Sequence, residues 1–109
     1  MKAETRECLI KADRDFETAE REFAVTTVAN YDAVCFHCQQ SAEKRLKGIL
    51  VEHGLPFQKT HDLTSLLDHI MGSYPELEEI RPALARLTDY SVGYRYPGMD
   101  ADIVDILRR

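Results

Sequence analysis

The sequence predicts an all-α protein, a four- to five-helix up-and-down bundle with a long central second helix. Three observations lead to this prediction. Apolar residues recur at intervals of three and four along most of the 109 residues, which is the spacing of one face of an α-helix. No segment alternates apolar and polar residues as a half-buried β-strand does. The connections between the helical patterns are short, as they are in helical bundles.

We expect residues 1–109 to form a single domain, because a chain of this length accommodates one hydrophobic core. Apolar residues make up 44% of the chain and charged residues 30%, which is typical of a globular protein. The 19 acidic and 14 basic residues give a net charge of −5. This excess disfavours non-specific binding to nucleic acid or anionic lipid, although it is compatible with a local basic groove.

The location of the protein is indicated by what the chain lacks. No apolar segment approaches the ~20 residues that a transmembrane helix requires, and the first seven residues are charged rather than signal-like. The three cysteines are an odd number and imply no disulfide framework. We therefore expect a cytoplasmic protein that does not associate with membranes.

The first helix is predicted over about residues 3–24. Apolar residues spaced by three and four define its buried face, and charged residues fill the other face: Leu9, Ala12, Phe16, Ala19 and Phe23. The β-branched cluster at 25–28 then weakens helix propensity, and Asn30 is a suitable N-cap for the next helix.

The second helix is predicted over residues 31–53 and would be ~35 Å long. It contains no proline and a single glycine, Gly48, and it ends where Gly54 supplies a C′ residue and Pro56 prevents continuation. A helix of this length must be the central element of so small a domain. Its buried stripe is Tyr31, Val34 or Cys35, Cys38, Ala42, Leu46, Ile49 and Leu50.

Three shorter helices are predicted after it. Thr60 is expected to cap a third helix that carries Asp62 in its first turn and ends at Gly72. A fourth begins near Pro75 or Glu76, with a kink or a late start at Pro82. It ends at or before Arg95, because the residue before Pro97 is pushed out of the helical region. Asp100 is expected to cap a short last helix. The inward residues of these helices are Leu63, Leu66, Leu67 and Ile70; Leu77, Ile80, Leu84, Leu87, Tyr90 or Ser91 and Tyr94; and Ile103, Ile106 and Leu107.

Three segments, taken in order, resemble the HEPN domain family. Residues 36–47, Phe-His-Cys-Gln-Gln-Ser-Ala-Glu-Lys-Arg-Leu-Lys, resemble the F-x-x-Q-Q-A-A-E-K-x-x-K helix of HEPN domains. Residues 60–67, Thr-His-Asp-Leu-Thr-Ser-Leu-Leu, resemble the family's H-x-L-x-x-L start of the third helix. Residues 94–98, Tyr-Arg-Tyr-Pro-Gly, resemble its R-Y-P element. The three segments span most of the chain in the family's order.

The resemblance implies a four- or five-helix bundle that commonly forms a twofold dimer and is often encoded beside a minimal nucleotidyltransferase. Many members are metal-independent RNA endonucleases that act as toxins or in defence, and others act as binding or partner modules. The active members carry an arginine followed after four to six residues by a histidine. Arg95 matches that arginine, and residues 96–102 contain no histidine.

We therefore interpret the chain as a non-catalytic HEPN-type module. It would dimerise and act with a partner, such as a minimal nucleotidyltransferase in a toxin–antitoxin pair, or bind the phosphate of a nucleotide or RNA. The alternative is a metal-independent RNA endonuclease that uses Arg95 with a non-standard acid or base, His61 or Asp100. Arginine can hold a phosphate but is a poor base, and an ordinary carboxylate is a weak proton donor at neutral pH. A simple nucleotide- or small-ligand-binding bundle is a third interpretation.

The candidate ligand-binding residues form two groups. Gln40, Lys44 and Lys47 lie one turn apart on the second helix, where a few cations could bind a phosphate despite the acidic net charge. Arg95 stands between Tyr94 and Tyr96, which could stack on bases, although tyrosines at such spacing are more often interface residues. The competing interpretation of the second-helix residues is a solvated polar face with an i, i+4 ion pair between Glu43 and Lys47. That face would comprise Gln39, Gln40, Glu43, Lys44 and Lys47.

Neither a metal site nor a cofactor is predicted. Cys35 and Cys38 fall on the apolar stripe, where cysteine behaves as a small hydrophobe, and there is no second cysteine pair to complete a zinc site. Among the four histidines, His61 is the one that another helix could bring near Arg95.

Overall fold

The structure, a computed structural model, describes residues 1–25 and 27–89. Within these residues the prediction of an all-α bundle is confirmed. They form α1 (Ala3–Phe23), α2 (Tyr31–Glu52), α3 (Leu63–Ile70), the 3-10 helix η1 (Pro75–Ile80) and α4 (Arg81–Thr88). None of these helices combines the length and the apolar composition needed to cross a membrane. The predicted end of the fourth helix and the last helix from Asp100 lie outside the described residues.

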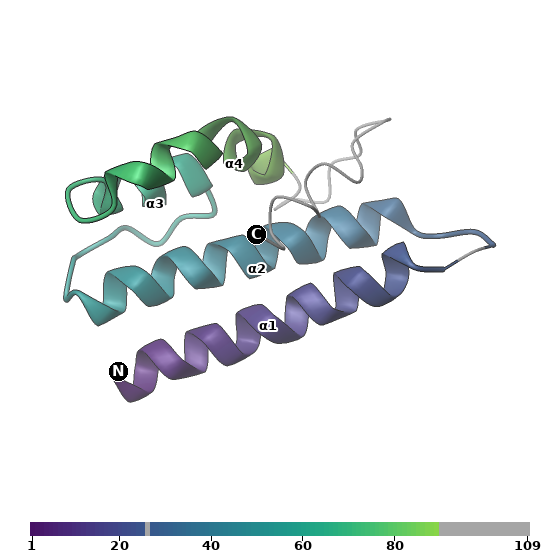
Figure 1. The fold of residues 1–109 in the computed structure, drawn as a ribbon, viewed down its shortest axis with the longest axis horizontal. Coiled ribbons are helices and arrows are strands. Elements are labelled where there is room, and N and C mark those ends of the chain that lie inside the picture. Colours follow the sequence, from purple (N-terminus) through teal and green to yellow (C-terminus); the bar gives the residue numbers. More distant parts are fainter. Residues whose placement is uncertain (26, 90–109) are drawn as a thin grey trace.

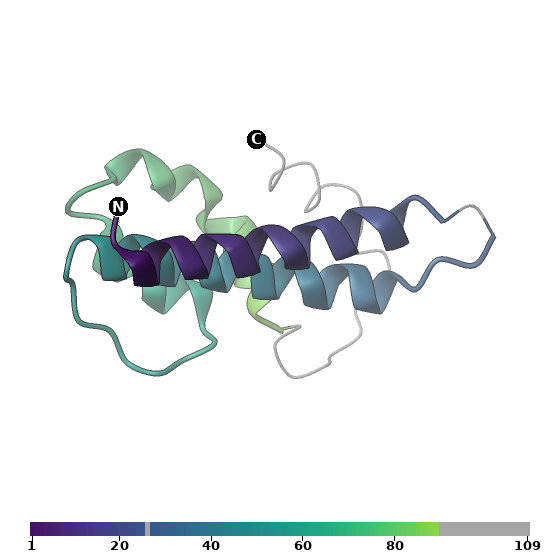
Figure 2. The same cartoon turned by 90° about the horizontal axis from the view of Figure 1, so that it is seen from below.

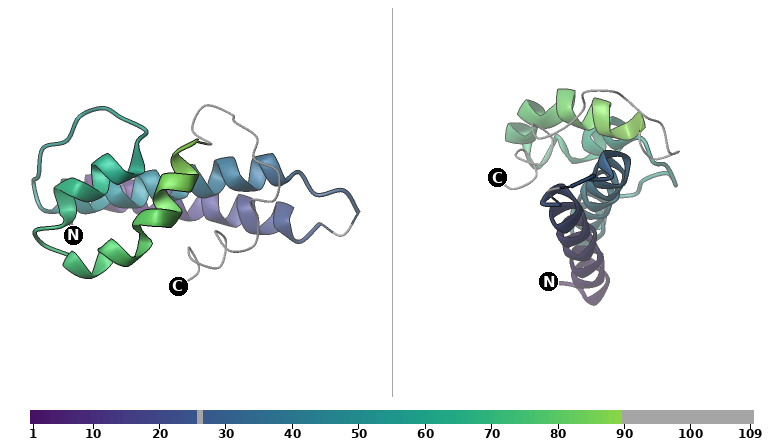
Figure 3. Two further views of the ribbon diagram at one scale, coloured as in Figure 1. Left: turned by 90° about the horizontal axis from the view of Figure 1, so that it is seen from above. Right: turned by 90° about the vertical axis from the view of Figure 1, so that its right-hand side faces the viewer.

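The two long helices, α1 and α2, form an antiparallel hairpin, and α3 and α4 lie on one side of it (Figure 1). Since α2 contacts α1, α3 and α4, the prediction that the second helix is central is confirmed. Views from below and above show α1 and α2 side by side along the long axis of the molecule (Figure 2, Figure 3). The connection between them projects beyond α3 and α4 at one end.

The α1–α2 contact is close because small residues line it. Ala12 and Ala19 of α1 are fully buried, and the Ser41 hydroxyl of α2 donates a hydrogen bond of 2.8 Å to the carbonyl of Ala12. A Cβ atom added at Gly48 would lie 3.2 Å from the Cβ of Cys8. Glycine is thus the residue that permits this approach of the two backbones.

The core lies between the hairpin and the α3–α4 side. The apolar stripe predicted for α2 is buried, with the exception of Ile49, which is partly buried, and Tyr31, which is 54% exposed. Tyr31 is exposed because it lies in the first turn of α2, at the end that projects beyond α3 and α4, where its ring meets the edge of Phe23. The predicted inward residues Leu63, Leu66, Leu67, Ile70, Leu84 and Leu87 are all buried.

Most of the predicted helix ends are confirmed, and one is wrong. The Asn30 side chain accepts a hydrogen bond from the N–H of Ala33, and Gly54 has a positive φ of 63° just after α2. The cap of α3 is Asp62 and not Thr60. The Asp62 carboxylate accepts from the backbone N–H groups of Thr64 and Ser65, while the Thr60 hydroxyl accepts from the N–H of Asp62.

The late start predicted at Pro82 is confirmed. Residues Pro75–Ile80 form a 3-10 helix, and the α-helix begins only at Arg81, so that Pro82 occupies the first turn, where its missing N–H costs nothing. The end of α4 is tied to the start of α3, because the backbone N–H of Leu63 donates a 3.0 Å hydrogen bond to the hydroxyl of Thr88.

Candidate functional site

A polar cluster around Glu43, in the middle of α2, is the candidate site. The Glu43 residue is only 6% exposed. Its Oε1 atom lies 2.7 Å from Nδ1 of His61 and accepts a 3.1 Å hydrogen bond from Nε2 of Gln39. Its Oε2 atom accepts a 3.1 Å bond from the Lys47 ammonium. The carboxylate thus has three partners, two from its own helix and one from the segment before α3.

The spacing of the residues along α2 explains why three members of this cluster lie together. Gln39, Glu43 and Lys47 are separated by four residues each, so they lie one above the other on the helix surface. His61 completes it because Asp62 caps α3, and the first residue of α3, Leu63, is fully buried in the core that α2 shares with α3.

The ion pair predicted between Glu43 and Lys47 is confirmed. The interpretation of this side of α2 as a solvated face is wrong for two of its five residues, since Gln39 is fully buried and Glu43 nearly so. His61 and the backbone of its segment cover them. His61 itself lies two residues before Leu63, the first residue of α3.

The electrostatics of Glu43 favour its ionised form. Burial alone would raise the pKa of this carboxyl group, because it disfavours the charged form. The hydrogen bonds from His61, Gln39 and Lys47, together with the charge of Lys47, outweigh burial, and the pKa of Glu43 is lowered. The cluster therefore holds a carboxylate, which can only accept hydrogen bonds.

A pair of glutamines extends the cluster. Gln40 donates a 2.7 Å hydrogen bond to Oε1 of Gln39. Gln39 in turn donates to Glu43 and, at 3.4 Å, to the backbone carbonyl of His61. The ring and the backbone of His61 are thus both held by the same face of α2. Gln40, a predicted phosphate ligand, is engaged in this network.

The two predicted phosphate-binding lysines of α2 are each paired with a carboxylate. Lys47 pairs with Glu43 at 3.1 Å. Lys44 donates to Asp15 of α1, whose other carboxylate oxygen lies 3.0 Å from Nδ1 of His37. A phosphate could bind either ammonium only in competition with a carboxylate that is already in place.

An open groove of about 380 Å³ runs beside these lysines, between α1 and α2. Its lining contains three glutamates and three lysines, so the groove is electrically balanced rather than basic. Lys11, the third lysine, pairs with Glu7 at 3.0 Å. The residues are Glu4, Glu7, Cys8, Lys11, Glu43, Lys44 and Lys47.

His61 is the most accessible member of the Glu43 cluster. Its side chain is 60% exposed. Because the Glu43 carboxylate can only accept, Nδ1 of His61 carries the hydrogen of their contact, and in the neutral ring Nε2 then holds a lone pair. No protein atom of the described residues forms a hydrogen bond with Nε2. An imidazole oriented by a buried carboxylate in this way can transfer protons.

The other predicted site residues, Arg95, Tyr94, Tyr96 and Asp100, lie outside the described residues. The chain leaves the described part at Asp89, directly after Thr88, which binds the N–H of Leu63. His61 stands two residues before Leu63. The end of the described part therefore lies beside the start of α3.

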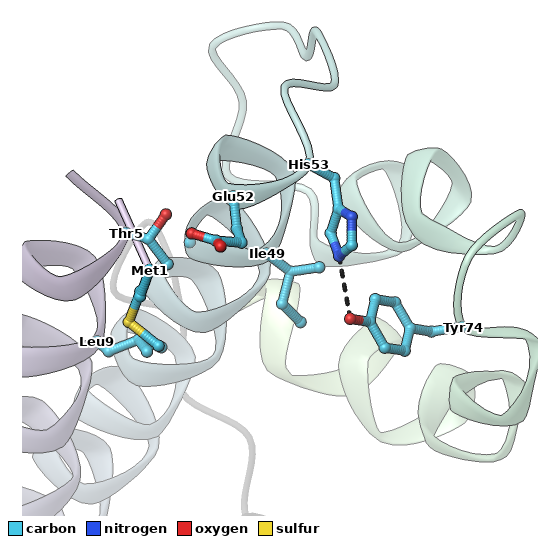
Figure 4. A pocket seen from close by; sticks show the side chains of 8 residues that line it. Met1, Thr5, Leu9, Ile49, Glu52, His53 and Tyr74 are labelled. Atoms are coloured by element: carbon cyan, nitrogen blue, oxygen red, sulfur yellow. Dashed lines mark hydrogen bonds between the residues drawn. The ribbon is translucent and has the colours of Figure 1, made fainter. Parts of the chain in front are cut away.

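A second, smaller pocket of about 180 Å³ lies between the start of α1 and the end of α2 (Figure 4). His53, the C-cap residue of α2, lies 3.0 Å from the hydroxyl of Tyr74 through its Nε2 atom. A hydrogen bond from the backbone N–H of Lys2 lowers the pKa of Glu52, the acidic residue of the lining. The rest of the lining is mainly apolar, and the pocket does not suit an anionic ligand.

The cysteines behave as the sequence predicts. Cys35 is 3% exposed and Cys38 is fully buried, so both are core residues. In the described ranges, no three histidine, cysteine or acidic side chains are gathered as metal ligands would be.

Sequence reasoning missed two features of this region. It did not identify Asp15 as the partner of Lys44 and His37, or Glu43 as the partner of His61. Both acids belong to polar positions in amphipathic helices, and their partners come from elements far away in the chain. The one signal in the sequence was Gln39, a polar residue that lies one helical turn from Cys35 of the apolar stripe and one turn from Glu43.

Comparison with known proteins gives one result. The sequence model of the HEPN domain family matches residues 5–106, nearly the whole chain. The match begins in α1 and includes the Glu43 cluster. No curated protein and no solved structure matches the chain at a significant level.

Proposed function

This chain belongs to the HEPN domain family, and we propose on that basis that it is a non-catalytic helical module that pairs with a second copy and acts through a partner. The observation that carries the proposal is a group of exposed apolar residues, close together in the chain, at and near the projecting end of the α1–α2 hairpin. We call it the hairpin-tip patch, and it consists of Val25, Val28, Tyr31 and Phe36.

The hairpin-tip patch is apolar and accessible. Its four side chains are 40%, 88%, 54% and 37% exposed, in chain order. They are four of the six large apolar residues exposed in the described part of the chain, and they fall within twelve consecutive positions. Exposed apolar residues gathered at one place are typical of a protein–protein contact.

A second copy of the chain is the partner that we propose for this patch. In a twofold dimer the same surface of each protomer covers its counterpart, so one apolar patch is enough to build the contact. The position of the patch at a free end of the hairpin supports this arrangement, since α3 and α4 leave that end open (Figure 1). Dimers of this kind are what the family resemblance implies.

Sedimentation tests the dimer. We expect the wild-type chain to sediment at micromolar concentration as twice its mass of 12.5 kDa. The double variant Val28→Asp, Phe36→Asp should be monomeric, because it buries two charges in the contact. Ile10→Asp is the matched control, since Ile10 is 45% exposed on α1 outside the patch. A monomeric wild type, or a double variant that still dimerises, would contradict the proposal.

The partner through which the module acts is proposed from the family. We propose a minimal nucleotidyltransferase, the two forming a toxin–antitoxin pair, and a nucleotide or RNA phosphate held by Arg95 with Tyr94 and Tyr96. Arg95 is preferred to the lysines of α2 because both of these are paired with carboxylates. A neighbouring reading frame with the pattern G-S-x(9–11)-D-x-D, whose product co-purifies with this chain, would support the partnership.

A second candidate function is a metal-independent RNA endonuclease. The observation that favours it is the His61 ring, exposed to solvent and oriented by a buried carboxylate, close to where the chain departs toward Arg95. Arg95 would hold the phosphate, and His61 rather than Asp100 would supply the acid or base. Cleavage of mixed RNA in the presence of EDTA, lost in Arg95→Ala, is the result expected of such an enzyme.

A further inference from the structure

The pocket between the start of α1 and the end of α2 contains a polar group that the fold leaves unused. Thr5 is only 3% exposed, and its hydroxyl group has no hydrogen-bond partner among the described residues. A buried hydroxyl group without a partner costs stability, and the large majority of buried polar groups in proteins are satisfied. Because Thr5 lines the pocket (Figure 4), a bound molecule can supply the missing partner.

We propose that this pocket binds a small uncharged aromatic molecule with one hydroxyl group, that is, a simple phenol. The ring would occupy the apolar part of the pocket, and its hydroxyl group would lie between Thr5 and Glu52. The size, the lining and the charges of the pocket each support this class of ligand. The inference goes beyond the function proposed above and depends on none of its parts.

The size of the pocket suits a single substituted ring. Its volume is about 180 Å³, and an apolar cavity of about 150 Å³ is large enough to bind benzene. The additional space accommodates a hydroxyl group. The pocket is partly open to solvent, so a molecule of this size can enter it without unfolding of the chain.

The lining of the pocket suits an aromatic body. Leu9 of α1 and Ile49 of α2 contribute apolar surface, and Tyr74 contributes an aromatic ring (Figure 4). The Tyr74 ring is held in place by His53, whose ring it meets edge-on at 5.5 Å between centroids and whose Nε2 atom lies 3.0 Å from its hydroxyl oxygen. A fixed aromatic ring favours a second ring beside it in an edge-on or offset arrangement.

The polar end of the pocket consists of Glu52 and Thr5. A hydrogen bond of 2.9 Å from the backbone N–H of Lys2 to Oε1 lowers the pKa of Glu52. The Thr5 hydroxyl lies close enough to lower this pKa further, but it does not reach hydrogen-bond geometry with the carboxylate. Glu52 is therefore ionised, and its Oε2 atom accepts no hydrogen bond from the described residues.

One hydroxyl group on the ligand would satisfy both residues. A phenol O–H can donate to Oε2 of Glu52, and the phenol oxygen can accept from the Thr5 hydroxyl. The carboxylate repels an anionic ligand. A cationic ligand is not required, because Lys2 already places a positive charge beside Glu52, with its ammonium 2.9 Å from the carbonyl oxygen of Val51.

The ligand must displace a side chain to reach the Thr5 hydroxyl, which is covered in the free protein. Met1 is the lining residue that can move. It is 71% exposed, and an unbranched methionine side chain changes its conformation easily. Binding would thus order the Met1 side chain against the ring of the ligand.

NMR titration of the full chain with phenol tests the proposal. We expect the backbone signals of the lining residues to shift and to saturate at phenol concentrations on the order of millimolar, as is usual for so small a ligand. Toluene, which has the size of phenol but no hydroxyl group, should bind about tenfold more weakly, which corresponds to one hydrogen bond to a charged group. Benzoate should not bind.

Thr5→Val is the decisive variant, because it replaces the hydroxyl group by a methyl group of the same shape. Since this hydroxyl has no partner in the free protein, the variant should unfold at the same or a higher temperature than the wild type. Its affinity for phenol should nevertheless fall about tenfold, and its affinity for toluene should not fall. Thr18→Val is the matched control on α1. It removes a hydroxyl group that donates to the carbonyl of Arg14, and it should leave phenol binding unchanged.

The possible outcomes decide the inference whether or not the chain dimerises or cleaves RNA. It is overturned if phenol at millimolar concentration shifts none of the lining signals, or if toluene binds as tightly as phenol. Tighter binding of benzylammonium than of phenol would overturn the assignment of an uncharged ligand. A loss of phenol affinity in Thr5→Val, with thermal stability retained, would support it.

Discussion

At the scale of the residue, the carboxylate of Glu43 is where three partners from two segments of the chain meet. Its two oxygens accept hydrogen bonds from Gln39, Lys47 and His61. A nearly buried charge with three hydrogen bonds stabilises the folded state, and its removal would leave its partners without an acceptor. The free energy of unfolding should therefore respond to this position and to its ionisation.

We expect Glu43→Gln to lower the free energy of unfolding at about pH 7 by about 1–3 kcal/mol, the cost of removing a hydrogen-bonded buried charge. The pKa of Glu43 is lowered on folding from its ordinary value of 4.5. Its contribution is therefore fully present above pH 4.5 and is lost as the pH falls through the lower, folded value. Urea denaturation of both proteins across this range measures the difference.

The difference between wild type and Glu43→Gln should accordingly shrink as the solution is acidified. Glu17→Gln, an exposed substitution on α1, is the control and should change little at any pH. A difference that stays constant down to the lowest pH would show that the charge of Glu43 does not contribute.

The burial of Glu43 could not be predicted from the helix period alone. The period correctly places Gln39, Glu43 and Lys47 on one side of α2, and the i, i+4 rule correctly pairs the last two. Which polar side becomes covered depends on the path of the segment before α3. That path is set by contacts between residues distant in the chain, such as those of His61 with α2.

At the scale of the element, the close approach of α1 and α2 depends on a single position. Gly48 lies in the interior of α2, where glycine costs helix stability. It is tolerated because Cys8 and Leu9 of α1 pack directly over it. The hairpin therefore gains contact area at the expense of helix propensity.

Gly48→Leu should separate the two long helices. The side chain would have to displace Cys8, whose Cβ lies 3.2 Å from the position of the first added carbon. We expect a loss of about 1–3 kcal/mol in the free energy of unfolding, as is typical of overpacking. Chemical denaturation measures it, with Gly72→Ala as the control, because no atom lies within 4 Å of a Cβ at Gly72. Equal stability of the two variants would be the contrary result.

The long helices were predictable to within one residue at each end. Strong periodicity defines α1 and α2, and Asn30 caps α2; residues 3–24 and 31–53 were expected, and Ala3–Phe23 and Tyr31–Glu52 are found. The start of α3 was less predictable because Thr60 and Asp62 are both competent caps. Asp62 is the cap because Leu63, which follows it, is fully buried.

At the scale of the whole molecule, the described residues share one core. Its buried cluster takes Ala19 from α1, five residues from α2, and the remaining residues from α3 and α4. A core that joins all four helices cannot melt in parts without exposing apolar surface elsewhere. We therefore expect one cooperative unit over the chain.

Calorimetry tests this expectation. Thermal unfolding should show a single transition in which the calorimetric and van't Hoff enthalpies, the latter analysed for the association state found by sedimentation, agree. Two separate transitions would mean that the hairpin and the α3–α4 side unfold independently, and would contradict the prediction of a single domain.

The hydrogen bond between Leu63 and Thr88 joins positions 25 residues apart. It closes α3, η1 and α4 into a lobe whose entrance and exit coincide. A lobe of this kind can gain or lose residues in its turns without displacing what flanks it. Changes in length at Gly72 and Ser73 should thus leave the separation between the Glu43 cluster and Asp89 unchanged. Natural or designed insertions there would alter the outer surface of the lobe but not the Glu43 cluster.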